Sequence, residues 1–396
     1  MRELTDPDWV ELVGGVPRWL PDGRLLHTVD EEDTRRLAAD GVALTPPGLQ
    51  VRRVAGVQDG HVVFTASREP TATELYRVAL AGGDPEPLTA PGGMADGAVG
   101  GPSLVTVRRS LERSGPEVVV RRGGVARAVA GAALPHGLEL HVRLLELGPR
   151  ALRAALVLPA GHGPGDGPLP VLLDPYGGPH AQRVVQAADA YLTSQWFADQ
   201  GFAVLVADGR GTPARGPAWE KAVAGDLASA PLEDQVDALH AAAEAVPGAL
   251  DLSRVAIRGW SFGGFLAALA VLRRPDVFHA AIAGAPVTDW SLYDTHYTER
   301  YLGTPQDDAA RYRRSSLLDD AAGLARPLLL IHGLADDNVV AAHTLRLSGA
   351  LLAAGRPHEV LPLSGVTHMT PQEVVAENLL RLQLEFLRRH LERPRT

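Results

Sequence analysis

The chain of 396 residues lacks cysteine, has no long apolar run and carries little charge. Without cysteine, disulfides, thiolate metal sites and cysteine nucleophiles are excluded. No apolar run reaches the ~18 residues that a membrane-spanning helix needs. The first residues, MRELTDPDWVELVGG, have neither the basic region nor the apolar region of a signal peptide. These absences predict a soluble, cytoplasmic protein.

Charged residues make up 21% of the chain, and the formal net charge is −9. A negative chain with a pI near 5.9 argues against nucleic acid or an anionic membrane as the main partner. Hydrophobic residues reach 45% of the chain, which is enough to build a full core. Because the length exceeds that of a usual single domain, two domains are expected.

Residues 1–130 are predicted to be all-β. Short alternating runs such as GVQDGHVVFTAS and PEVVVRRGGVARAVA contain Asp-Gly and Gly-Gly pairs, which suit the positive φ angles of tight turns. A meander of this kind is typical of four-stranded propeller blades. The segment is long enough for about two to three blades, fewer than the ~4–8 of a closed propeller, so we expect a partial β-propeller.

Residues 131–396 are predicted to form an α/β domain. Nearly continuous apolar runs such as FAVLVAD and PLLLIHG indicate strands buried on both faces, hence a mostly parallel sheet with helices on both sides. The predicted strands are Leu152–Leu158, Val171–Asp174, Ala203–Asp208, Val255–Arg258, Ala280–Ala283, Leu328–His332 and Glu359–Leu363. The predicted helices are Tyr191–Gln200, Leu232–Val246, Gly263–Arg273, Val340–Ala354 and Pro371–His390.

The segment Gly259-Trp260-Ser261-Phe262-Gly263 fits the pattern G-x-S-x-G between a predicted strand and a predicted helix. A serine at such a turn is strained and lifted above the sheet, and the flanking glycines make room for the close passage of the chain. The following helix directs free N–H groups towards whatever the serine attacks. The alternative is a glycine-rich turn in which Ser261 serves as a helix N-cap.

A serine nucleophile needs a base, and the base needs a group that orients it. In α/β-hydrolases an acidic residue and then a histidine follow the serine. Asp336 and Asp337 follow one predicted strand and His368 follows the next, at the strand ends where such sheets bind ligands. Spacing alone leaves both aspartates open, since Asp337 would also suit a turn or helix cap. His332 lies within a strand end and is expected to be buried and bonded to the backbone.

Six segments in residues 131–396 together form a specific set of motifs. They are DPYGGPH (174–180), ADGRGT (207–212), GWSFGG (259–264), APVTDWSLYDTHYTERYLG (285–303), HGLADDNV (332–339) and GVTH (365–368). On these motifs, the chain from about Leu152 to its end resembles the catalytic domain of the prolyl oligopeptidase family of serine peptidases. Within that family, it is most similar to the dipeptidyl peptidase IV-like branch. The resemblance implies an α/β-hydrolase fold over residues 131–396. It also favours Asp336 over Asp337, because the first aspartate of A-D-D-N-V belongs to the family's triad.

The resemblance implies roles for further residues. Tyr176 matches the tyrosine whose hydroxyl completes the oxyanion hole with the N–H of Phe262, and a preorganised hydroxyl suits that role. Asn338 matches the residue that binds a backbone carbonyl of the substrate. Around the apolar S1 pocket for proline, the expected substrate-binding residues are Trp260, Val287, Trp290, Tyr293, Tyr297 and Val339, although such aromatics also suit a core. Independently of the resemblance, His180 and His296 are candidates for the pocket, although neither follows the last predicted strand.

The first half departs from the family, which carries a complete propeller. In the dipeptidyl peptidase branch this propeller supplies two adjacent glutamates that bind the free amine of the substrate. Glu31-Glu32 is the only adjacent pair in the first half, and its surroundings, DEEDTRRL, predict an exposed turn. Strict dipeptidyl aminopeptidase specificity is therefore not expected, and the chain is interpreted as a fragment, a misassigned gene start or a natural truncation.

The combined prediction is a serine peptidase that cleaves after Pro or Ala through an acyl-enzyme, with no metal or cofactor. An esterase, an aminoacyl hydrolase or a peptide cyclase is the first alternative, because fold and triad do not fix the acyl group. A non-catalytic remnant or interaction protein is the second, because a partial propeller leaves unpaired strand edges. The expected partner is a peptide or small acyl substrate, and the resemblance alone indicates a homodimer.

Overall fold

The structure is a computed structural model and describes residues 3–163 and 165–391. Its contacts divide the chain into two compact units. Unit 1 comprises Met1–Glu139, Val184–Leu192 and Thr212–Lys221, and unit 2 comprises Leu140–Arg183, Thr193–Gly211 and Ala222–Thr396. The domain boundary between residues 130 and 131 stays a prediction.

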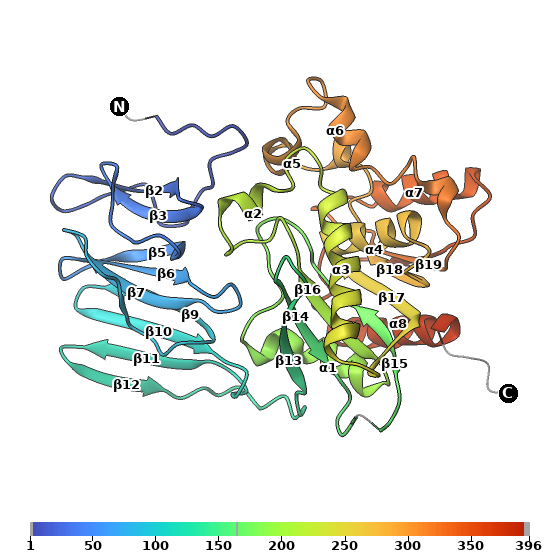
Figure 1. Cartoon of the computed structure of the whole chain (residues 1–396), viewed down its shortest axis with the longest axis horizontal. Helices are drawn as coiled ribbons and strands as arrows, with labels where there is room; N and C mark the ends of the chain where they lie inside the picture. Colours follow the sequence, from blue (N-terminus) through green and yellow to red (C-terminus); the bar gives the residue numbers. More distant parts are fainter. Residues whose placement is uncertain (1–2, 164, 392–396) are drawn as a thin grey trace. The chain divides into compact units, whose positions relative to one another are not determined.

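Three four-stranded antiparallel sheets make up most of unit 1, and each is a meander of strands in chain order (Figure 1). Four strands per sheet is the composition predicted for a blade, while the propeller itself stays a prediction. The sheets are β1 (Arg18–Trp19), β2 (Leu25–Glu31), β3 (Thr34–Ala39) and β4 (Val42–Ala43); β5 (Gln50–Gln58), β6 (His61–Ser67), β7 (Glu74–Ala79) and β8 (Glu86–Pro87); and β9 (Met94–Gly100), β10 (Ser103–Arg109), β11 (Glu117–Arg122) and β12 (Val125–Val129).

Apolar side chains of successive sheets form the core of unit 1. Leu26 of β2, Val54 of β5 and Phe64 of β6 belong to one buried cluster, which joins the first sheet to the second. Leu75 of β7 and Leu104 of β10 belong to a smaller cluster, which joins the second sheet to the third. The alternation of apolar and polar residues along these strands therefore buries one set of side chains between neighbouring sheets.

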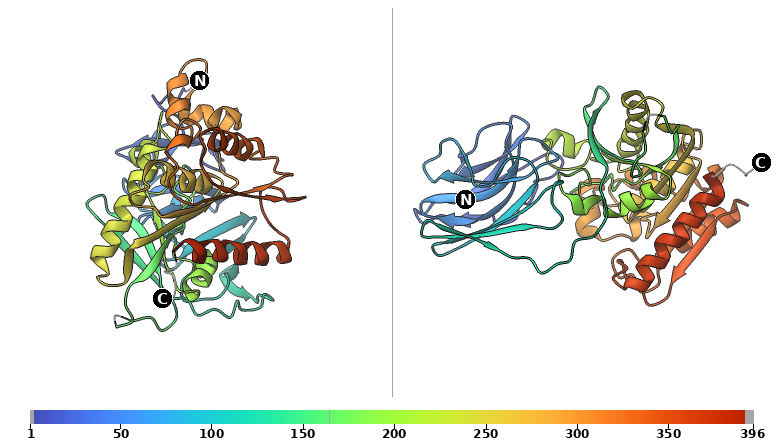
Figure 2. Two further views of the ribbon diagram at one scale, coloured as in Figure 1. Left: turned by 90° about the vertical axis from the view of Figure 1, so that its right-hand side faces the viewer. Right: turned by 90° about the horizontal axis from the view of Figure 1, so that it is seen from below.

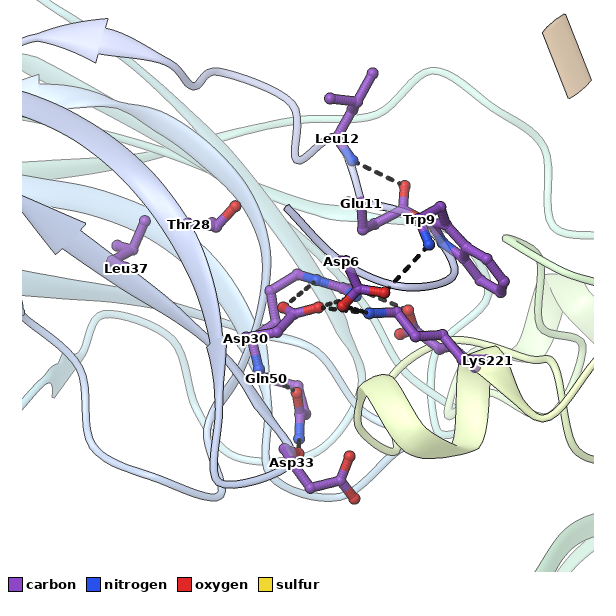
Figure 3. Close-up of polar contacts among 12 residues, drawn as sticks. Asp6, Trp9, Glu11, Leu12, Thr28, Asp30, Asp33, Leu37, Gln50 and Lys221 are labelled. Carbon is purple, nitrogen blue, oxygen red and sulfur yellow. Dashed lines mark hydrogen bonds and ion pairs between the residues drawn. The ribbon is translucent and has the colours of Figure 1, made fainter. Parts of the chain in front are cut away.

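An ion-pair cluster holds α2 (Pro217–Lys221) within unit 1 (Figure 3). The ammonium group of Lys221 pairs with the carboxylate of Asp6, and Arg35 Nη1 donates to Glu220 Oε2 at 2.8 Å. Burial raises the pKa of the Glu220 carboxyl, and the charge of Arg35 opposes that effect. Loss of one partner would leave a buried charge unpaired, so this cluster ties a late segment of the chain to the β-rich unit.

The adjacent pair Glu31 and Glu32 lies at the turn between β2 and β3. Their side chains are 48% and 70% exposed, and both carboxylates lie within 4 Å of Arg36 Nη1, at 3.4 and 3.9 Å. Glu32 and Asp33 have φ angles of 53° and 51°, which suits a two-residue hairpin turn. The predicted exposed turn is confirmed, and Arg36 provides a counter-charge for the pair.

An eight-stranded sheet forms the centre of unit 2, in the order β13-β14-β16-β15-β17-β18-β19-β20. Strands β13 and β14 pair antiparallel at one edge, and the pairs from β16 to β20 are parallel. Every residue of β16 and of β19 is buried, as expected for strands covered on both faces. The strands are β13 (Val142–Leu147), β14 (Leu152–Val157), β15 (Leu169–Leu173), β16 (Ala203–Asp208), β17 (Leu250–Trp260), β18 (Ala280–Gly284), β19 (Leu328–Gly333) and β20 (Glu359–Leu363).

Helices cover both faces of this sheet. α3 (Ser229–Ala245) and α4 (Phe262–Arg273) contact each other on one face, and α8 (Glu373–Leu391) lies against β17 and β18 on the other (Figure 2). Within residues 3–163 and 165–391, no helix is long and apolar enough to cross a membrane. The other helices are η1 (Ala188–Tyr191), α1 (Leu192–Asp199), η2 (Trp290–Leu292), α5 (Thr295–Leu302), α6 (Ala309–Arg314), η3 (Ala321–Gly323) and α7 (Ala342–Ala353).

The mostly parallel sheet with helices on both faces is as predicted, and the differences concern individual elements. Strand β13 and the short helices α2, α5 and α6 were not predicted, and β17 begins at Leu250 rather than at Val255. The missed elements are short or lie at the edge, where the apolar pattern is weak.

Candidate active site

Ser261 lies at the turn between β17 and α4, at the carboxyl end of an interior strand of the sheet. Its backbone has φ 59° and ψ −118°, a conformation that a residue with a Cβ adopts only under strain. Its side chain makes no capping hydrogen bond to α4, so the N-cap alternative does not explain it. Its N–H donates to the carbonyl of Gly284 at 2.9 Å, which ties the turn to β18.

Glycine is required on both sides of Ser261 because backbone segments touch there. A Cβ at Gly259 would lie 2.2 Å from the carbonyl carbon and oxygen of Gly263. A Cβ at Gly263 would lie 2.6 Å from the carbonyl oxygen of Pro175, in the loop after β15. The G-x-S-x-G spacing therefore follows from the contact of strand, helix and loop at this turn.

Asp336 and His368 meet in the loops that follow β19 and β20. His368 Nδ1 donates to Asp336 Oδ2 at 2.8 Å, and the carboxylate is fully buried. The other oxygen, Oδ1, accepts the backbone N–H groups of Asn338 and Val339 at 3.0 and 2.9 Å. Because Nδ1 carries the donated proton, Nε2 is the atom left to accept one. Asp337, the other candidate, is exposed.

A second histidine, His332, lies behind the carboxylate. Its Nε2 is 3.7 Å from Asp336 Oδ2 and 2.7 Å from the carbonyl oxygen of Val339, and its Nδ1 is 2.7 Å from Thr344 Oγ1. Because a carbonyl only accepts, the imidazole donates from Nε2. Burial lowers the pKa of His332, so the ring is neutral near pH 7. The prediction of a buried, backbone-bonded histidine is confirmed.

Trp260 holds the loop that carries His368. The indole Nε1 donates to the carbonyl oxygen of His368 at 2.7 Å, so the residue before Ser261 positions the backbone of the base. The substrate contact expected of Trp260 stays a prediction. In the described part of the chain the hydroxyl of Ser261 has no hydrogen-bond partner, and contacts of this kind are often long until substrate binds.

Tyr176 lies in the loop after β15, beside the turn of Ser261. Its ring centroid is 5.9 Å from that of Phe262, and a Cβ at Gly178 would lie within 3 Å of the same phenyl ring. Burial raises the pKa of Tyr176 well above its usual range, with smaller contributions from Tyr293 and Tyr301. The hydroxyl therefore stays protonated and can donate a hydrogen bond, as an oxyanion hole requires.

Aromatic rings cluster beside Phe262, whose ring centroid is 5.7 Å from that of Trp290. Trp290 and Tyr297 stack with centroids 6.0 Å apart, and the ring of Tyr293 meets them edge-on at 5.8 and 5.3 Å. The two valines expected in the pocket, Val287 and Val339, are 2% and 0% exposed. The structure thus brings the aromatic residues into contact with one another, and the role of the whole set in binding stays a prediction.

The amide of Asn338 has a defined orientation. The hydroxyl of Tyr293 donates to Asn338 Oδ1 at 3.2 Å. The amide NH₂ group is then left to donate to another acceptor, such as a substrate carbonyl. Asn338 also follows Asp336 by two residues, so the same turn carries a triad candidate and a substrate-binding candidate.

The sequence model of the prolyl oligopeptidase family matches residues 189–394, more than half of the chain. The chain belongs to the prolyl oligopeptidase family. The predicted family, which is one of serine-type peptidases, and the α/β-hydrolase fold preceded by a β-rich region are confirmed.

Several proteins that are similar to this chain are dipeptidyl peptidases by name. The chain is 40% identical over 196 residues to dipeptidyl peptidase 8 of Mus musculus, covering 48% of this chain and 22% of that protein. It is 34% identical over 309 residues to a probable dipeptidyl-aminopeptidase B of Coccidioides posadasii, covering 73% of this chain and 33% of that protein. The crystal structure of Porphyromonas gingivalis dipeptidyl peptidase 4 superposes with a TM-score of 0.85 at 27% identity, over 94% of this chain and 55% of that one. The chain therefore spans well under two thirds of the length of these family members.

Two further aromatic residues, Phe265 and Tyr301, belong to the same cluster of rings and are not among the residues predicted from the sequence. Phe265 meets Trp290 edge-on at 5.5 Å, and Tyr301 meets Tyr297 at 4.9 Å. Their spacing was a usable signal, since Phe265 follows Ser261 by one helical turn and Tyr301 follows Tyr297 by one turn of α5. Of the two further histidine candidates, His180 lies edge-on to Tyr297 at 5.4 Å, while His296 is exposed.

Proposed function

We propose that the chain is a peptidase that hydrolyses bonds on the carboxyl side of Pro or Ala through an acyl-enzyme on Ser261. One observation carries the proposal: His368 Nδ1 donates to the buried carboxylate of Asp336 at 2.8 Å, in the same sheet that holds Ser261 in a strained turn. An Asp–His pair of this kind leaves the imidazole Nε2 to accept the proton of a hydroxyl, which is how a weak hydroxyl nucleophile is activated once substrate brings the groups together.

In the proposed reaction, Ser261 Oγ attacks the substrate carbonyl carbon while His368 Nε2 takes its proton. Asp336 holds the imidazole in the required orientation and stabilises its charged form. The proton then passes from His368 to the leaving amine. Water repeats the sequence on the acyl-enzyme, which releases the acid and restores the serine.

The oxyanion is proposed to accept hydrogen bonds from the Tyr176 hydroxyl and the Phe262 N–H. Support for Tyr176 comes from its contact with Phe262 and from the raised pKa that keeps its hydroxyl protonated. One such donor is worth about 10²–10³ in kcat in comparable sites.

The preference for Pro or Ala is proposed from the cluster of aromatic rings. The flat faces of Trp290, Tyr293 and Tyr297 suit a compact ring better than a long or charged side chain. The Asn338 amide, oriented by Tyr293, is proposed to bind a backbone carbonyl of the substrate. Both features favour a peptide over a simple ester.

Rates on three chromogenic substrates test the proposal, with Ser261→Ala as the blank. The substrates are a free-amino Xaa-Pro anilide, the same anilide with a blocked amine, and a short-chain nitrophenyl ester. Hydrolysis of an anilide that is lost in a folded S261A protein supports a peptidase. Turnover of the ester alone favours the esterase alternative, and anilide hydrolysis that persists in S261A contradicts the assignment of Ser261.

A homodimer is also proposed, as the resemblance indicates. Apolar side chains are exposed along α7, the edge strand β20 and α8, namely Leu352, Val360, Val374 and Leu382, and an open sheet edge favours association with a second copy. A monomer in sedimentation velocity at assay concentration would contradict this. The cytoplasmic location stays a prediction.

A further inference from the structure

A buried charge network lies directly behind the loop that carries Tyr176. Asp174, two residues before Tyr176, is 2% exposed. Its Oδ1 accepts from Arg258 Nη1 at 3.0 Å, and its Oδ2 accepts from Arg183 Nη2 at 3.0 Å and from Ser194 Oγ at 3.4 Å. The carboxylate is therefore held by donors on both oxygens.

Arg258 belongs to the strand that ends at the nucleophile. It precedes Ser261 by three residues on β17, and its Nε donates to Gln383 Oε1 at 3.1 Å. Its guanidinium also lies over the ring of Phe197, 4.8 Å from the centroid. Burial lowers the pKa of this guanidinium, and the negative charge of Asp174 opposes that effect. Arg258 is thus fixed from three sides, and Asp174 supplies its counter-charge.

The register of the sheet brings these two residues together. Leu173 of β15 pairs with Ile257 of β17, so Asp174 and Arg258 are the next residues along the two parallel strands. From there one chain continues to Tyr176 and the other to Ser261. The Asp174–Arg258 pair thus links the two strands just before they lead to the two proposed oxyanion donors.

We propose that Asp174 and Arg258 are positioning residues that hold the Tyr176 hydroxyl at the place where the oxyanion develops. The inference rests on the proposed role of Tyr176 and extends it to the residues behind it. A buried ion pair seldom gives more stability than apolar side chains of the same size. Because the pair lies where the Tyr176 loop begins, it instead fits a role in orienting the Tyr176 hydroxyl. A shift of a catalytic group by about 1 Å can lower the rate about 10²-fold.

A double-mutant cycle tests the inference. The proteins are wild type, Asp174→Asn, Tyr176→Phe and the double variant D174N/Y176F, with kcat and KM measured on the most reactive chromogenic substrate. The rate at which a fluorophosphonate labels Ser261 gives a second readout, because phosphonylation also places an oxygen in the oxyanion hole. Circular dichroism checks that each variant is folded.

We expect D174N to lower kcat about tenfold to hundredfold, with KM within about threefold. In the Y176F background the same change should cost less than about twofold, because the residue through which Asp174 acts is already disabled. Equal losses in both backgrounds would show that Asp174 acts elsewhere, and a folded D174N with wild-type kcat would also overturn the inference.

Asp251→Asn serves as a matched control. Asp251 lies on the same strand β17, at its other end, and pairs with Arg254 at 2.7 Å with a side chain that is 13% exposed. D251N therefore removes a comparable paired carboxylate far along the strand from Tyr176, and its kcat should stay within about twofold of wild type. A loss as large as that of D174N would indicate a general effect of charge loss and would overturn the inference.

If D174N does not fold, Arg258→Lys replaces it in the cycle. The lysine keeps the positive charge, but its single ammonium group cannot replace the planar guanidinium that contacts both Asp174 and Gln383. The same pattern of a kcat loss that disappears in the Y176F background is expected, and additive losses would contradict the inference. A Y176F protein with wild-type kcat would refute both the oxyanion role and this inference, whereas S261A decides the peptidase proposal independently.

Discussion

Replacing Asp336 by asparagine removes one charge from the proposed triad while keeping the shape of the side chain. In the native site Oδ1 accepts the N–H groups of Asn338 and Val339 at 3.0 and 2.9 Å. An asparagine keeps both bonds only if its carbonyl oxygen takes the place of Oδ1. Its NH₂ group then faces His368 Nδ1, which has to accept rather than donate.

The imidazole of the D336N variant is therefore held in the wrong tautomer. With Nδ1 as acceptor, the proton of the neutral ring sits on Nε2, the atom that must take the proton of Ser261. A loss of about 10⁴-fold in kcat is expected for such a change, which corresponds to about 5.5 kcal/mol of transition-state stabilisation. KM should change little, because the residues proposed to bind substrate keep their contacts.

Asp337→Asn is the matched control, since Asp337 is the adjacent, exposed carboxylate. Its kcat on the Xaa-Pro anilide should stay within about twofold of wild type, as for a surface change away from the reacting atoms. A folded D336N protein that keeps more than about a tenth of the wild-type kcat would refute the reasoning. A large loss in D337N would instead move the triad role to that residue.

Two further predictions concern pH and substrate affinity. Burial lowers the pKa of His343 from its ordinary value of 6.5 to about 4, so the unfolded chain binds more protons between these values and stability falls as pH drops, by up to about 3 kcal/mol. His343→Asn, which keeps an acceptor at the position of Nδ1, should flatten the fall in urea midpoint between pH 7 and pH 4.5, and an unchanged slope would contradict this. Tyr293→Phe removes the donor to Asn338 Oδ1 and should raise KM about threefold to tenfold with little change in kcat; a fall in kcat at constant KM would argue against the proposed orientation of the amide.

The sheet of unit 2 can be predicted because most of its strands are short apolar runs. β16 and β19 are buried at every residue. Except at their last residues, both sequences are continuous apolar runs, which is the pattern of a strand covered on both faces. β13 escapes this reasoning, because at the sheet edge its residues are half-buried or exposed except for the buried Leu147. The first residues of β17, LDLSR, are equally ambiguous, since polar side chains interrupt the run.

The candidate site also contains residues that the sequence can predict and residues that it cannot. Ser261 can be predicted from the G-x-S-x-G spacing, because contacts at Gly259 and Gly263 force that pattern on the sequence. Spacing could not separate Asp336 from Asp337, since the loop geometry decides which carboxylate turns inward. In the structure Asp336 accepts the N–H groups of its own turn and also the hydrogen bond of His368. The turn cap considered for Asp337 and the triad role considered for Asp336 are therefore both filled by Asp336.

The Asp174–Arg258 pair lies beyond sequence reasoning of this kind, since 84 residues separate its members. Strand register brings them together, and register cannot be read from a motif. The two proposed oxyanion donors are consequently held by different means. The N–H of Phe262 is fixed by the covalent turn and its glycines, whereas the hydroxyl of Tyr176 depends on a loop whose root is an ion pair. Changes to buried charge should therefore affect the Tyr176 donor and leave the Phe262 donor in place, which is the asymmetry that the double-mutant cycle measures.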